Sequence, residues 1–141
     1  MHYRFAPAFF ATLLLVGCGD ATGPRTYAEV QGTYDVSAPI AEVPGARFSG
    51  TMTIVDDSRD TPEFGGTYTL SLIGADGANH GRFTGDLVNG AVTGAGSVRF
   101  YLDDDKFRWS GAVSDEGGVT GTWVLANAAS NYTGTFVAAT R

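Results

Sequence analysis

Few side chains in this 141-residue chain combine the residue types and spacing that chemistry requires. His80 follows Asp76-Gly77-Ala78-Asn79, with neither a second histidine nor a nucleophile at the spacing of a metal site or catalytic triad, so we expect it to be solvent-exposed. The acidic runs Asp103-Asp104-Asp105 and Asp56-Asp57-Ser58-Arg59-Asp60, the latter with Glu63, offer oxygen ligands suited to Ca²⁺. Neither run has the Asp-x-Asp-x-Asp-Gly spacing of a calcium loop, and consecutive Asp residues are common in turns. We therefore expect no enzyme activity, no metal and no other cofactor.

Cys18 is the one residue whose surroundings indicate a chemical modification. His2 and Arg4 precede an almost wholly apolar run from Phe5 to Val16, which ends in Leu15-Val16-Gly17-Cys18. This arrangement resembles a bacterial lipoprotein signal peptide with its Leu-x-Gly-Cys lipobox. The resemblance implies that the leader is cleaved before Cys18, that the Cys18 thiol receives a diacylglyceryl group, and that the new amino terminus is acylated.

Two other interpretations of this leader are a membrane-spanning helix and an ordinary secretory signal. The apolar run of about twelve residues is shorter than the roughly twenty that a spanning helix needs. An ordinary signal would leave an unpaired cysteine at the start of the mature chain. Two or three acyl chains make a stable membrane anchor. Because Gly19 rather than an Asp follows Cys18, the resemblance favours the outer over the inner membrane of a bacterial cell envelope.

Composition limits the partners and the redox chemistry of the mature chain. Loss of residues 1–17 leaves 124 residues, which is enough for one domain with its own core. Arg4 leaves with the leader, so eight basic residues face fifteen acidic ones, a balance that opposes binding to nucleic acid or anionic lipid surfaces. Cys18 is the only cysteine, which excludes an internal disulfide. We predict three parts: a signal peptide (1–17), the lipidated cysteine with a flexible tether (18–25), and a barrel domain (26–141).

A short pattern recurs along the domain: an aromatic residue, a small residue, glycine, and then alternating apolar positions. Phe48-Ser49-Gly50, Phe83-Thr84-Gly85, Trp109-Ser110-Gly111 and Tyr132-Thr133-Gly134 are four copies. The period of two predicts half-buried strands, and no stretch has a helical period. We predict eight strands, near residues 28–36, 46–56, 65–74, 81–88, 91–102, 106–114, 118–126 and 131–140.

Two turns set the predicted strand register. Asn89-Gly90 is a strong signal for a two-residue type I′ hairpin, which would pair Val88 with Ala91 and place Gly85 opposite Gly94 and Phe83 opposite Gly96. This register sorts apolar from polar side chains on both strands.

A second turn, Asp115-Glu116-Gly117, has glycine at the left-handed position of a three-residue hairpin loop. Glycines facing each other on the inner side of a sheet allow sharp bending. The predicted inward pairs are Val113 with Val119, Gly111 with Gly121, Trp109 with Trp123, and Phe107 with Leu125.

Eight consecutive antiparallel strands without a helix predict an all-β, up-and-down barrel, whose closure removes exposed sheet edges. The opening Gly32-Thr33-Tyr34, the repeated Gly-x-aromatic units and the closing Gly134-Thr135-Phe136 resemble the lipocalin-like and avidin-like barrels of the calycin group. The resemblance implies the architecture and carries over no ligand.

The interior of a small barrel is either filled by side chains or holds one small ligand. An apolar, aromatic interior suits a small apolar ligand, so we predict a binding role; the alternative is a structural or protein-interaction module of the envelope with a solid-packed barrel. The oligomeric state is left open. The predicted interior site consists of Tyr34, Met52, Tyr68, Phe83, Phe100, Trp109, Trp123 and Phe136.

Overall fold

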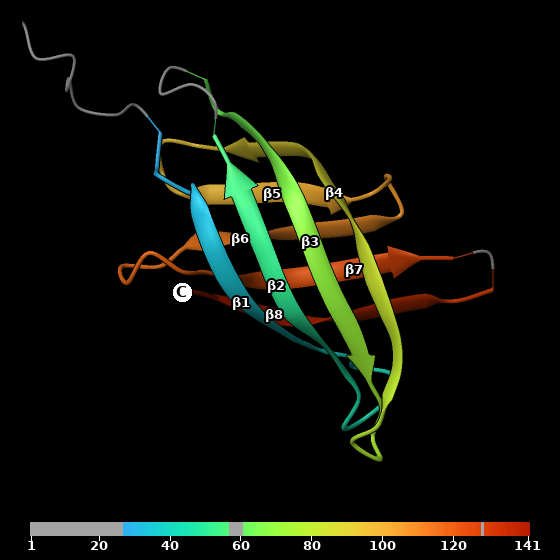
Figure 1. Ribbon diagram of the computed structural model, residues 1–141. Coiled ribbons are helices and arrows are strands. Elements are labelled where there is room, and N and C mark those ends of the chain that lie inside the picture. The colour runs from blue at the N-terminus through green and yellow to red at the C-terminus, as the bar shows by residue number, and fades with distance from the viewer. Residues whose placement is uncertain (1–26, 57–60, 128) are drawn as a thin grey trace, which may run out of the picture.

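The computed structural model describes residues 27–56, 61–127 and 129–141, which form a closed, eight-stranded antiparallel barrel (Figure 1). Each strand pairs with the next along the chain, and the last pairs with the first, as the sequence predicts. The leader, Cys18 and the tether lie outside the described residues, as do Asp57 to Asp60. The strands are β1 (Gly32–Pro39), β2 (Arg47–Val55), β3 (Glu63–Ile73), β4 (Asn79–Val92), β5 (Ser97–Leu102), β6 (Phe107–Val113), β7 (Val119–Ala126) and β8 (Asn131–Thr140).

Alternation along each strand sorts the side chains between the barrel interior and the solvent. In β1, Tyr34, Val36 and Ala38 are buried, whereas Asp35 and Ser37 between them are exposed. Successive residues of a strand point to opposite faces, so the buried residues of each strand lie on one face and pack into a common core. No helix in the described part of the chain is long and apolar enough to cross a membrane.

The β6–β7 hairpin has the register that the sequence predicts. Trp109 pairs with Trp123 and Gly111 with Gly121. A Cβ atom built on Gly111 would lie 2.1 Å from the carbonyl oxygen of Thr120. The backbone of β7 therefore occupies the space that a side chain at residue 111 would need, which explains why glycine stands there.

The predicted hairpin turn at Asn89-Gly90 is wrong. β4 continues through these two residues to Val92, and they form an irregularity in its ladder with β5, with Asn89 at φ 52°. Asn tolerates positive φ, which serves this irregularity at Asn89 as it would serve a type I′ turn. β4 continues because it remains paired with β3, where the Val92 N–H donates to the Pro62 carbonyl at 2.8 Å.

The chain turns four residues later than predicted. The Thr93 N–H donates to the Ser97 carbonyl at 2.9 Å, and Gly96 takes the left-handed conformation with φ 83°. As a result Gly85 does not face Gly94; its partner on β3 is Tyr68. In the ladder between β4 and β5, Leu87 pairs with Leu102, and no pair of this ladder joins Phe83 to Gly96 as predicted.

The two ends of the barrel differ. At the end where the described chain begins, Val30 is fully buried in the core, and the Tyr34 hydroxyl donates to its carbonyl at 2.6 Å. This entering segment covers the interior there. The opposite end carries the β1–β2, β3–β4, β5–β6 and β7–β8 turns, at the right and bottom of Figure 1.

Candidate functional site

The open end of the barrel contains two adjoining cavities, of about 330 and about 360 Å³. Phe48, Phe83 and Leu125 line both, and we call the combined hollow the cup. Leu70, Leu102, Phe107 and Ala126 add to the apolar wall of the first cavity. Further apolar lining of the second cavity includes Ile40, Val43, Leu72 and Tyr132.

The strand register brings the aromatic rings of the cup together. Phe48 on β2 lies 6.3 Å from Phe83 on β4 and 5.5 Å from Phe107 on β6, measured between ring centroids. Phe83 occupies an inward position, paired with buried Leu70, yet its side chain is 47% exposed because it stands at the mouth. An inward-facing aromatic ring that remains wet provides apolar surface for a bound molecule to cover.

The structure places the predicted interior residues at two depths. Tyr68 and Phe83 line the cup. The others lie in the core beneath it, each with at most 1% of its surface exposed. These core residues are Tyr34, Met52, Phe100, Trp109, Trp123 and Phe136.

The core beneath the cup contains a cluster of aromatic rings in mutual contact. Trp109 lies 4.8 Å from Phe136, 5.7 Å from Phe100 and 6.3 Å from Trp123 between centroids. The Trp123 ring in turn lies 5.4 Å from Phe48, so it forms part of the floor beneath the cup. The Trp109 indole nitrogen has no hydrogen-bond partner among the described residues.

Phe48, Phe107 and Leu125 are among the cup residues that are absent from the predicted site. The signal for two of them is present in the sequence, because the predicted β6–β7 register already faces Phe107 with Leu125 on the inner side. What the pattern does not contain is the distance of that pair from the barrel mouth.

A carboxylate is fixed on one wall of the cup. Asp103, at the end of β5 with φ 61°, accepts a hydrogen bond from the Asp86 N–H at 3.0 Å and another from the Tyr68 hydroxyl. Gly85 leaves room for this carboxylate, since a Cβ there would lie 1.9 Å from Asp103 Oδ1. Burial raises the pKa of Tyr68, and the hydrogen bond to Asp103 raises it further, so the phenol stays protonated and remains a donor.

The adjoining β5–β6 turn adds more charge to the same wall. Asp104 Oδ1 accepts the Lys106 backbone N–H at 2.8 Å, and both residues line the first cavity. The consecutive Asp residues thus have a local role in a turn. Among the described residues, no group of three or more His, Cys, Asp or Glu side chains is placed to hold a metal ion.

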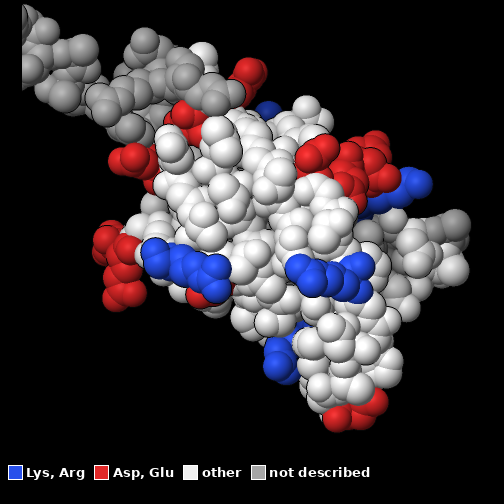
Figure 2. All heavy atoms as spheres, viewed as in Figure 1, with Lys and Arg blue, Asp and Glu red and all other residues white. Residues whose placement is uncertain are grey.

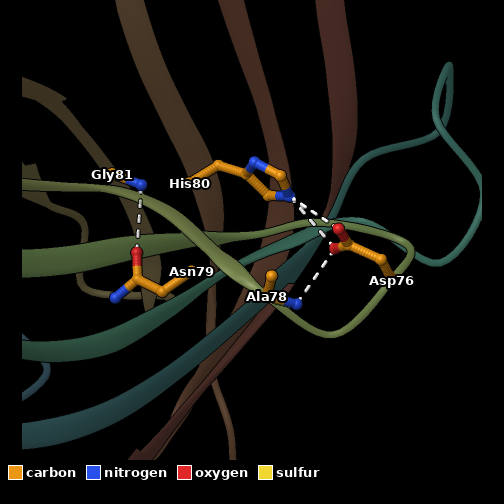
Figure 3. A network of polar contacts seen from close by, with 5 residues as sticks. All are labelled: Asp76, Ala78, Asn79, His80 and Gly81. Carbon is orange, nitrogen blue, oxygen red and sulfur yellow. Dashed lines mark hydrogen bonds and ion pairs between the residues drawn. The ribbon is translucent and has the colours of Figure 1, made fainter.

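His80 is exposed, as predicted, and is one of the residues that line the second cavity. Figure 3 shows its ring directed toward the Asp76 carboxylate. Its Nε2 lies 3.0 Å from Asp76 Oδ1, which also accepts the Ala78 N–H at 2.9 Å. These hydrogen bonds, the one from Ala78 first, lower the pKa of Asp76. The network ties the β3–β4 turn to the start of β4.

The β1–β2 turn is also fixed at the rim. Glu42 accepts hydrogen bonds from the Thr133 hydroxyl at 2.6 Å and the Thr133 N–H at 2.9 Å. These bonds lower the pKa of Glu42. Because Thr133 is on β8, the contact fastens this turn across the barrel seam.

No protein-family model matches the chain, and neither a curated protein nor a solved structure shows significant similarity to it.

Proposed function

We propose that this chain is a non-catalytic, lipid-anchored protein of the bacterial cell envelope whose barrel binds a small apolar ligand in the cup. The observation that carries the binding role is the pair of adjoining apolar cavities that share Phe48, Phe83 and Leu125. Small-molecule sites usually enclose about 300–1,000 Å³ and combine apolar walls with a few polar groups. The cup has this size and this composition.

Hydrogen bonds within the protein fasten the walls of the cup. The Glu42–Thr133 and Asp76–His80 contacts fasten two of its turns. A site that is already ordered loses less conformational entropy on binding, which favours affinity.

The position of the cup suits the proposed anchor. The described chain begins at the opposite end of the barrel, where Val30 is buried. A lipid on Cys18, joined through residues 19–25, would therefore be connected to the barrel at that end. The cup would be left open away from the point of attachment.

A second candidate is a structural or protein-interaction module of the envelope. It is favoured by the core beneath the cup, whose six predicted interior residues are packed with almost no exposed surface. Under this alternative the cup would take no small ligand.

A dye titration distinguishes the two candidates. The test uses residues 26–141, since all eight strands pair among themselves within this part of the chain. An environment-sensitive apolar dye should bind saturably at one site per chain and be displaced by competing apolar molecules. Absence of saturable binding across a panel of dyes and competitors would favour the interaction module.

A pair of matched variants places the bound dye. Phe83→Asp should abolish dye binding, because it introduces a charge into the cup. Val137→Asp removes another exposed apolar side chain, 53% exposed on β8, and should bind the dye as the wild type does. Equal losses in both variants would contradict a site in the cup.

A further inference from the structure

The polar wall of the cup is predominantly acidic. Asp103, Asp104 and Lys106 line the first cavity, so its charged lining residues are two carboxylates and one ammonium group. Asp105 in the same turn adds another exposed acidic side chain. Figure 2 shows a group of acidic side chains with one basic side chain beside it, where Figure 1 places the turn after β5.

The effect of this charge reaches the cavity wall. The Tyr68 hydroxyl, which lines the cup, has its pKa raised first by burial, then by the hydrogen bond to Asp103, and then by the charges of Asp103, Asp104 and Asp86. These neighbouring carboxylates disfavour a further negative charge at this point of the wall.

The Asp103 carboxylate is also prepared to accept more hydrogen bonds. It uses one bond from the Asp86 N–H and one from Tyr68, whereas an ionised carboxylate has about four acceptor positions. The left-handed backbone at Asp103 (φ 61°) directs the carboxylate, and the missing side chain of Gly85 leaves the space that the carboxylate occupies. An incoming donor thus meets an acceptor that is already oriented.

The apolar side of the cup presents aromatic rings to the same space. The Phe48 ring lies 6.3 Å from the Phe83 ring and 5.5 Å from the Phe107 ring between centroids, and all three side chains line the first cavity. The face of an aromatic ring attracts a cation within about 6 Å of its centroid. Carboxylates beside aromatic rings are a combination that recognises organic cations.

We infer that the ligand of the cup is a cationic amphiphile, with its ammonium group beside Asp103 and Asp104 and its apolar part against the three phenylalanines. This inference rests on the proposed function, because it specifies the chemistry of the molecule bound in the cup. A ligand with a carboxylate or phosphate head would meet two carboxylates at this wall instead, which disfavours a fatty acid.

Three probes with one chain length test the inference: decylammonium, which has three N–H donors, decanol and decanoate, titrated calorimetrically into residues 26–141 below their micelle concentrations. The cationic probe should bind about two- to fivefold more tightly than decanol, as expected for a solvent-exposed ion pair, and decanoate should bind most weakly. The preference should shrink at high salt, because ions screen exposed charges. Equal affinities, or tightest binding of decanoate, would overturn the inference but leave the proposed function standing. Failure of all three probes to bind would overturn both.

A matched pair of variants assigns the preference to the wall. Asp103→Asn tolerates the left-handed backbone, keeps its oxygen for the Asp86 N–H, and can donate its Nδ2–H to the Tyr68 hydroxyl oxygen. The fold should therefore persist while the preference for the cation over decanol falls below about twofold. Asp115→Asn makes the same charge change on an exposed turn at the other end of the barrel and should keep the wild-type preference. A preference that survives in Asp103→Asn, or falls equally in both variants, would overturn the assignment.

Discussion

Substitutions in the core and in the cup should separate stability from binding. Trp109 is 0% exposed and packs against four rings, the nearest of them Phe136 at 4.8 Å. Truncation of a buried aromatic residue costs about 3–5 kcal/mol in transfer and cavity terms, so Trp109→Ala should lower the free energy of unfolding by about that amount. Because Trp109 does not line the cup, the dissociation constant of a bound apolar dye should change by less than about twofold.

Phe83→Ala should affect binding more than stability. Full burial of a phenylalanine is worth about 1.5–3 kcal/mol, and Phe83 is already 47% exposed, so the free energy of unfolding should fall by only about 1 kcal/mol. The lost ring contact should weaken dye binding about five- to tenfold, which corresponds to about 1–1.4 kcal/mol.

Urea denaturation followed by circular dichroism measures stability in this comparison, and dye titration of the folded protein measures affinity. Trp109→Phe provides a milder core variant, since it keeps a ring and removes the indole N–H that has no partner in the described part of the chain. If a folded Trp109 variant lost binding while Phe83→Ala retained it, the ligand would lie in the core and the division into core and cup would be refuted.

Three further predictions concern the backbone, the anchor and the buried phenols. Gly111→Ala should lower the free energy of unfolding by about 1–3 kcal/mol, because the new Cβ would lie 2.1 Å from the Thr120 carbonyl oxygen. An unchanged midpoint of thermal unfolding would contradict the close approach of β6 and β7. Cys18→Ser should abolish labelling by radioactive palmitate and move the chain from washed membranes to the soluble fraction; retention in the membranes would refute the lipoprotein assignment. Burial raises the pKa of both Tyr34 and Tyr68, so the stability that these phenols contribute is complete below their ordinary pKa of 10.0 and is lost as the pH rises above it. The urea midpoint should therefore fall above about pH 10, and less steeply in Tyr68→Phe; an identical fall in both proteins would show that Tyr68 does not contribute.

The strand pattern predicts the fold well because alternation and turn chemistry are both local. The three-residue loop after β6 is enough to place Trp109 opposite Trp123. Asn89-Gly90 misleads because positive φ serves a bulge and a turn equally, and only the pairing of β4 with β3, which is not local, decides between them.

The candidate site is less predictable than the fold. A period of two states that Trp109 and Phe83 both face inward, but it carries no information about depth along the barrel axis. Depth depends on strand tilt and on which turns meet at one end, so Trp109 lies in the packed core and Phe83 at the mouth. The Tyr68–Asp103 contact joins residues 35 positions apart in the sequence, and no local motif predicts it.

Mapping of ligand contacts by NMR tests the binding site most directly. Amide and side-chain methyl signals of isotopically labelled residues 26–141 would be recorded during titration with an apolar dye. We predict saturable shifts around Phe48, Phe83 and Leu125 at the open end, with the signals around Val30 at the covered end unchanged. No saturable shifts, or shifts centred on the covered end or the outer face of the barrel, would contradict a ligand site in the cup.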